Sequence, residues 1–202
     1  MAEFDILFYI GQSFLLLFVV MDPIGAVPFF TALTRSLSKA ERNRVANRTT
    51  IITFLLLSAF AYAGSYILLY LGVTISDFQV AGGIFLLVFG LRDAIVGEPL
   101  GVKGEEAAQS ASIFPLATPL LAGPGSITTV MLISGMPNGL FLVFVTIGLN
   151  CIASWFLFRI SSSVSKRLGK SGLMVIAKLL DIIMGALGVA YISVGLRNIL
   201  AA

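Results

Sequence analysis

Histidine is absent from this 202-residue chain, cysteine occurs once, and charged residues make up only 11% of it. Without histidine the commonest metal ligand and general base is missing, and a single cysteine cannot form an intrachain disulfide. A soluble domain carries roughly a quarter charged residues, so this chain has too little polar surface to face water on all sides. We therefore expect no enzyme, no catalytic residues, no metal site and no cofactor.

Hydrophobic residues are abundant instead, at 58% of the chain, and they fall into six long runs. The runs cover residues 6–34, 49–71, 78–96, 112–134, 140–160 and 173–200. A helix needs about 20 residues to cross the hydrocarbon core, and backbone groups cannot stay unpaired in lipid. The sequence therefore predicts an all-α integral membrane protein with six transmembrane helices.

The net charge of +3 comes from basic residues that gather in two short segments between the apolar runs. They are Arg35, Lys39, Arg42, Arg44 and Arg48, and then Arg159, Lys166, Arg167 and Lys170. Short basic loops mark the cytoplasmic side of a membrane protein. This distribution predicts a multi-pass protein of the cell membrane with both termini outside. It indicates the lipid bilayer as partner and not nucleic acid, and it leaves homo-oligomer formation open.

Two segments of the chain resemble each other. Residues 78–95 and 183–200 align without gaps, with identities at Ala81/Ala186, Gly83/Gly188, Gly90/Gly195, Leu91/Leu196 and Arg92/Arg197. Residues 21–30 and 122–131 share a Pro/Gly interruption at a similar offset. Each half holds three spans, an odd number, so the second half must enter the membrane upside down. We predict one membrane domain, 1–202, made of a first repeat (1–96), a polar cytoplasmic loop (97–112) and a second, inverted repeat (113–202).

Spans one and four contain clustered proline and glycine. Asp22, Pro23 and Gly25 interrupt the first, and residues 122–126 interrupt the fourth. Proline removes a backbone donor and glycine tolerates irregular angles, so both helices are predicted to be discontinuous. One such break is commonly a kink, but matched breaks in inverted halves are typical of a transporter site.

A new half-helix is expected after each break, with Asp22 and Ser126 as N-caps. Its free N–H groups and positive dipole end would point to the middle of the bilayer and could hold an anionic group without a basic side chain. Hydroxyls such as those of Thr128 and Thr129 would assist. The predicted substrate-binding residues are Asp22, Pro23, Gly25, Thr118, Gly123, Pro124, Gly125 and Ser126.

Asp22 has two interpretations, which the sequence leaves open. An ionisable side chain at membrane depth is costly and usually functional, which makes Asp22 a candidate partner for a substrate ammonium group or a candidate for proton coupling. Alternatively, it only caps its own half-helix.

Several segments of the chain resemble the MarC/SnatA family of six-span membrane proteins, also known as UPF0056. They are FPLATPLLAGPGSI at 114–127, AERNR at 40–44, VAGGIFLLVFGLR in span three and LGKSGLMVIAKLL before span six. The resemblance implies a transporter of small neutral amino acids such as glycine and alanine. Family members commonly have Asn-Pro where this chain has Asp22-Pro23.

Three functions compete on this basis. The leading hypothesis is a secondary transporter of small neutral amino acids, with its site where spans one and four cross. The alternative is a passive channel or a drug-efflux component. An intramembrane enzyme is disfavoured, because Ser126 has no histidine to activate it.

Overall fold

The computed structural model describes residues 2–34, 37–96 and 116–201, and all regular structure in these ranges is helical. The elements are α1 (Ala2–Met21), α2 (Ala26–Leu33), α3 (Lys39–Tyr70), α4 (Ile75–Val96), the π-helical turn η1 (Leu116–Leu121), α6 (Pro124–Ser134) and α7 (Gly139–Leu200). The predicted all-α class is confirmed for these residues. The predicted polar loop at 97–112 lies outside them.

Three helical stretches are long and apolar enough to cross a membrane: Lys39–Tyr70, Gly139–Ser161 and Lys178–Leu200. Three shorter apolar helices accompany them, at Ile6–Met21, Ile75–Val88 and Pro124–Ser134. Large apolar side chains are exposed along the outside, as at Leu55 and Ile152, whereas the hydroxyls of residues such as Thr53 are fully buried. A soluble protein rarely exposes such extensive apolar surface, so the distribution is that of a helical integral membrane protein.

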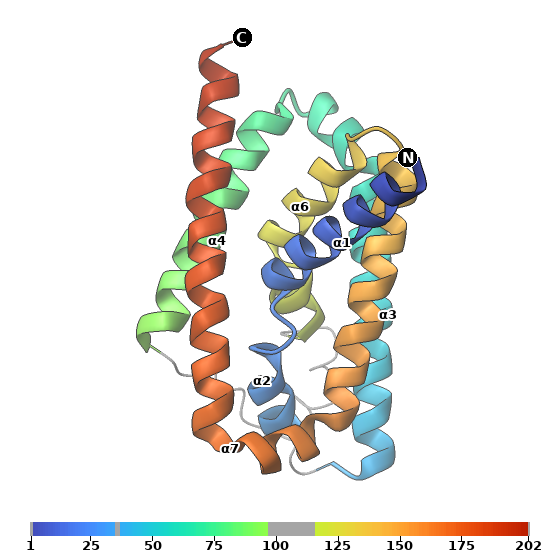
Figure 1. Cartoon of the computed structure of the whole chain (residues 1–202), viewed down its shortest axis with the longest axis vertical. Coiled ribbons are helices and arrows are strands. Elements are labelled where there is room, and N and C mark those ends of the chain that lie inside the picture. The colour runs from blue at the N-terminus through green and yellow to red at the C-terminus, as the bar shows by residue number, and fades with distance from the viewer. Residues whose placement is uncertain (1, 35–36, 97–115, 202) are drawn as a thin grey trace.

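The basic segment between the last two apolar runs is helical, and the prediction of a loop there is wrong. α7 continues from Gly139 to Leu200 without interruption. It bends at the bottom of Figure 1, and its two limbs rise on opposite sides of the molecule. Residues 161–172 contain no proline, so every residue of this segment keeps the backbone N–H that a continuous helix needs.

The first basic segment is also partly helical, because α3 begins earlier than the apolar run. Ser38 and Glu41 form a reciprocal cap: the Ser38 N–H donates to Glu41 Oε2 (2.9 Å), and the Glu41 N–H donates to Ser38 Oγ (3.3 Å). This capping box starts the helix at Lys39. Arg42 therefore lies on α3 instead of in a loop.

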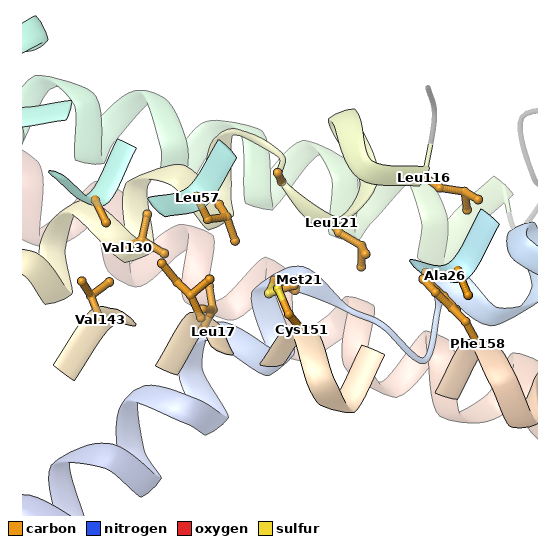
Figure 2. Packing of buried hydrophobic residues seen from close by; sticks show 14 of the residues in the cluster. Leu17, Met21, Ala26, Leu57, Leu116, Leu121, Val130, Val143, Cys151 and Phe158 are labelled. Carbon is orange, nitrogen blue, oxygen red and sulfur yellow. The ribbon is translucent and has the colours of Figure 1, made fainter. Parts of the chain in front are cut away.

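One apolar core joins both parts of the chain. Figure 2 shows Met21 at the end of α1 beside Cys151 of α7, and Leu121 of η1 near them in the same cluster. Ala26, the first residue of α2, belongs to this cluster too. The ends of the interrupted helices are thus packed into the interior and do not lie on the surface.

The half-helix α2 is held between α3 and α7 at the end of the molecule that carries the α7 bend. Phe30 of α2 and Phe158 of α7 are fully buried and stack with ring centroids 4.6 Å apart and an interplanar angle of 4°. The Arg42 guanidinium lies 5.4 Å from the Phe30 ring centre and donates to Ser161 Oγ at 2.6 Å. The two stacked rings, with the Arg42 guanidinium over the Phe30 ring, fill this end of the core.

α4 packs against the second limb of α7 in antiparallel orientation (Figure 1), with glycine at the points of contact. A Cβ atom on Gly83 would lie 2.7 Å from the Gly188 carbonyl oxygen. One on Gly188 would lie 2.6 Å from the Gly83 carbonyl oxygen. The two backbones therefore touch, as the glycine content of these segments predicts.

A second set of glycine contacts repeats this reciprocity. A Cβ atom on Gly90 would lie 2.5 Å from the Asp181 carbonyl oxygen, and one on Gly195 would lie 2.9 Å from the Ser76 carbonyl oxygen. Gly90 and Gly195 are aligned with each other in the gap-free alignment of the two segments. When that alignment is extended by two residues toward the N-terminus, it also aligns Ser76 with Asp181. Each contact therefore has a counterpart with the two helices exchanged.

Replacing Gly188 with alanine should destabilise the protein by about 1–3 kcal/mol, because the added methyl would meet the α4 backbone. Gly185→Ala is the matched control on the same helix, since a Cβ there meets nothing within 4 Å. Thermal unfolding in detergent measures both. Equal melting temperatures for the two variants would contradict the close contact.

Candidate functional site

The first break separates α1 from α2 at residues 22–25. Asp22 adopts a left-handed backbone (φ 42°), its carbonyl oxygen accepts from the Ala26 N–H (3.0 Å), and its Oδ1 accepts from the Gly25 N–H (3.0 Å). A carbonyl that accepts the first helical bond and a side chain that accepts from the third N–H are the two marks of an N-cap. Asp22 therefore caps the second half-helix, as the sequence predicts.

Gly25 is required by this cap. A Cβ atom at this position would collide with the Asp22 carboxylate. Pro23 between them is buried and has no N–H that needs a partner. The three residues together turn the chain from one half-helix into the next.

The second break separates η1 from α6. Gly123 is the N-cap of α6, with an extended backbone (φ −78°, ψ 173°), and Pro124 occupies the first helical turn. Ser126 is therefore not the N-cap that the sequence predicts. It lies inside the first turn, and its Oγ donates to the Leu121 carbonyl oxygen at 2.7 Å. Because proline is pre-organised for the first helical position, α6 begins before Ser126 can cap it.

The two breaks share one local plan but differ in their caps. In each, an N-cap residue is followed directly by proline, at Asp22-Pro23 and at Gly123-Pro124. The Asp22 carboxylate accepts a hydrogen bond from a backbone N–H at the start of its half-helix, whereas no side chain caps α6 in the described structure. The backbone N–H groups at the start of α6 therefore have no side-chain cap, unlike those at the start of α2.

The hydroxyls expected to assist at the second break have other partners. Thr128 Oγ1 donates to the Pro124 carbonyl oxygen and Thr129 Oγ1 to the Gly125 carbonyl oxygen, both at 2.9 Å. Thr129 Oγ1 also lies 3.0 Å from the hydroxyl of Tyr191. A hydroxyl has one proton to donate, so an anionic group at this break would depend on backbone N–H groups.

The start of α6 lies against the end of α1. A Cβ atom on Gly125 would lie 3.2 Å from Val20 Cγ1, two residues before Asp22, and 2.7 Å from Leu86 Cγ of α4. Only a residue without a side chain allows this approach. The structure thus brings the two predicted breaks together, next to α4.

Thr118 differs from the other predicted site residues. It is exposed, and its backbone is extended (φ −135°, ψ 126°) within η1. This irregular residue lies in η1, before the N-cap Gly123 of the second break.

Sequence reasoning missed a group of buried polar side chains on uninterrupted helices. They are Thr49 and Thr53 of α3 and Thr146 of α7, which are fully buried together with Asn150 of α7. Asn150 alone is conspicuous in the sequence as a polar residue in the middle of a span, and it forms the helix–helix hydrogen bond usual for such a residue, to the Phe14 carbonyl oxygen of α1. No proline or glycine marks the threonines. Their one signal is the spacing of four residues within otherwise apolar helices, which places each pair on one helix face.

The amino-acid sequence was compared with models of known protein families. The model of the MarC family, described as integral membrane proteins, matches residues 7–200. The chain belongs to the MarC family. It is an integral membrane protein of a multi-pass family.

Relatives of this MarC protein match over nearly their whole length. A UPF0056 membrane protein of Methanocaldococcus jannaschii is 36% identical, over 95% of this chain and 98% of its own. One of Aquifex aeolicus is 33% identical, over 99% of this chain and 97% of its own. The UPF0056 membrane protein YvbG of Bacillus subtilis is 33% identical, over 94% and 95%. No solved structure matches the chain.

Ser126→Ala should lower the free energy of unfolding of this MarC protein by about 1–3 kcal/mol, because the buried donor to the Leu121 carbonyl is lost at a helix break. Ser134→Ala is the control: its Oγ donates to the Met131 carbonyl at the other end of α6, where the side chain is only half-buried. Thermal unfolding in detergent should show the larger loss for Ser126→Ala. A loss no greater than that of the control would contradict the role of Ser126 in the second break.

Proposed function

We propose that this protein is a secondary transporter of small neutral amino acids, such as glycine and alanine, with its binding site between the two helix breaks. The contact between the start of α6 and the end of α1 is the observation that carries the proposal. Transporters bind their substrates at discontinuous helices, where half-helix N-termini face anionic groups. The uncapped start of α6 suits the carboxylate of an amino acid.

The proposed architecture is six spans in two inverted repeats of three. The exchange symmetry of the glycine contacts between α4 and α7 supports it, as does the shared cap–proline plan of the two breaks. Under this proposal the two limbs of α7 are spans five and six. Alternating access would then come from movement of one half against the other.

The proposed orientation places both termini outside the cell membrane, with the α7 bend in the cytoplasm. The positive-inside rule supports it. On the same side, Trp155 Nε1 donates to Asn47 Oδ1 at 2.7 Å and the Arg159 guanidinium lies 4.5 Å from the Trp155 ring centre. Tryptophan beside arginine is typical of a membrane–water interface. Under this orientation the stacked Phe30 and Phe158 would close the cytoplasmic end of the proposed pathway.

Purified protein in liposomes should take up labelled glycine and alanine in a saturable manner, and unlabelled substrate inside should accelerate uptake by counterflow. Protein-free liposomes are the control. The absence of saturable uptake of any small amino acid would contradict the proposal. Flux that neither saturates nor shows counterflow would favour a channel or drug-efflux component.

Asp22 is the candidate for coupling transport to protons, because it is the carboxylate at the breaks. Asp22→Asn keeps a side-chain oxygen that can cap the half-helix but cannot carry a proton. We expect the variant to fold and to lose the dependence of glycine uptake on a pH gradient. Uptake with unchanged pH dependence would restrict Asp22 to capping.

A further inference from the structure

Five buried side-chain oxygen atoms lack a hydrogen-bond partner within the described part of the chain. One is Ser58 Oγ, on a half-buried side chain, and the other four belong to fully buried side chains. These four are the Oγ1 atoms of Thr49, Thr53 and Thr146 and the Oδ1 atom of Asn150. All four side chains are 0% exposed. Buried polar atoms are nearly always paired, so this group calls for a ligand or for ordered water.

Other buried hydroxyls in the same helices satisfy themselves locally. Thr50, next to Thr49 on α3, donates to the Ala46 carbonyl oxygen at 3.0 Å, and Ser154 of α7 donates to the Asn150 carbonyl oxygen at 2.8 Å. This local bond is the usual solution for a hydroxyl in an apolar helix. Thr49 and Thr53 do not form this local bond, although the adjacent Thr50 does.

The orientation of the Asn150 amide is determined by its donors. Nδ2 donates to the Thr146 carbonyl oxygen (2.9 Å) and to the Phe14 carbonyl oxygen of α1 (3.3 Å). A flipped amide would set its oxygen against two carbonyl oxygens. Oδ1 can therefore only accept, and its missing partner must be a donor or a cation.

Asn150 and Thr53 lie at the same level on neighbouring helices. Asn150 lies against α1, because its Nδ2 donates to the Phe14 carbonyl oxygen there, and the next residue, Cys151, belongs to the apolar cluster that contains Met21 at the end of α1 (Figure 2). α3 and the first limb of α7 run antiparallel (Figure 1). The bond between Asn47 and Trp155 then brings Thr53 to the level of Asn150.

α3 also contacts the second break, because it packs against both η1 and α6 as well as α7. Gly64 of α3 meets Met131 of α6 closely: a Cβ on that glycine would lie 2.9 Å from the methionine sulfur. The helix that carries the unpartnered hydroxyls thus adjoins the second break.

We propose that Thr49, Thr53 and Asn150 bind the ammonium group of a zwitterionic amino acid whose carboxylate lies at the start of α6. This inference rests on the proposed transport function and extends it to the polarity of the substrate. An ammonium group supplies three N–H donors and no acceptor, which suits a set of neutral oxygens. Neutral oxygens can take water when the substrate leaves, whereas a buried carboxylate would be left uncompensated.

The test compares variants on one helix in liposomes. Thr53→Val and Thr49→Val remove a hydroxyl at nearly constant shape and should raise the KM for glycine about tenfold, the usual effect of one hydrogen bond to a charged group. Thr50→Val is the matched control, since its hydroxyl already has a backbone partner, and should change KM less than about twofold. Thr53→Ser retains the hydroxyl and should restore the wild-type KM.

Substrate analogues test the chemistry independently. N,N,N-trimethylglycine has no N–H donor and glycolate has no ammonium group, so both should compete with glycine poorly in the wild type. The discrimination against trimethylglycine should shrink in Thr53→Val, because the selective hydroxyl is gone.

The failures are distinguishable. A wild type that takes up no amino acid overturns both the transport function and this inference. Glycine transport in which Thr49→Val and Thr53→Val match Thr50→Val overturns the inference alone and assigns the oxygens to water. A Na⁺ requirement that Thr53→Val abolishes, with analogue discrimination unchanged, assigns them to an ion and also overturns it.

Discussion

A helix that stops inside a membrane leaves backbone N–H and C=O groups that lipid cannot satisfy, and the rest of this protein is arranged around two such places. The first break satisfies its donors with the Asp22 carboxylate, and Ser126 supplies a donor to the Leu121 carbonyl at the second. Both breaks are enclosed by core residues of α1, η1, α6 and α7. The ends of the half-helices are thus kept in the interior, whereas the irregular residue Thr118 of η1 is exposed.

Close packing of helices makes this enclosure feasible. Gly125 lets the start of α6 approach α1 and α4, and the glycines shared by α4 and the second limb of α7 let their backbones touch. Lipid is as apolar as the helix surfaces, so tight contact between small residues, and not hydrophobic burial, holds such helices together. The same glycines therefore serve both the architecture and the position of the breaks.

The difference between the two breaks is chemically informative. The Asp22 carboxylate accepts from the Gly25 N–H at the start of one half-helix, whereas no side chain caps the other in the described structure. The neutral oxygens of Thr53 and Asn150 are fully buried on α3 and α7 and have no hydrogen-bond partner among the described residues. Backbone donors at the start of α6 and neutral acceptors on α3 and α7 are the two kinds of group that the proposed zwitterionic substrate would need.

The sequence by itself determined the helical membrane class and the position of both breaks, because apolar runs, proline and glycine act locally. It offered capping as one of two roles for Asp22, and the structure shows the cap. It did not determine where α6 begins, since Pro124 and Ser126 compete within one turn. It also did not reveal Thr49 and Thr53, which look like any threonines in an apolar helix. Only the tertiary structure decided which hydroxyls pair with their own backbone and which face the interior unpaired, because that depends on neighbours that are distant in the chain.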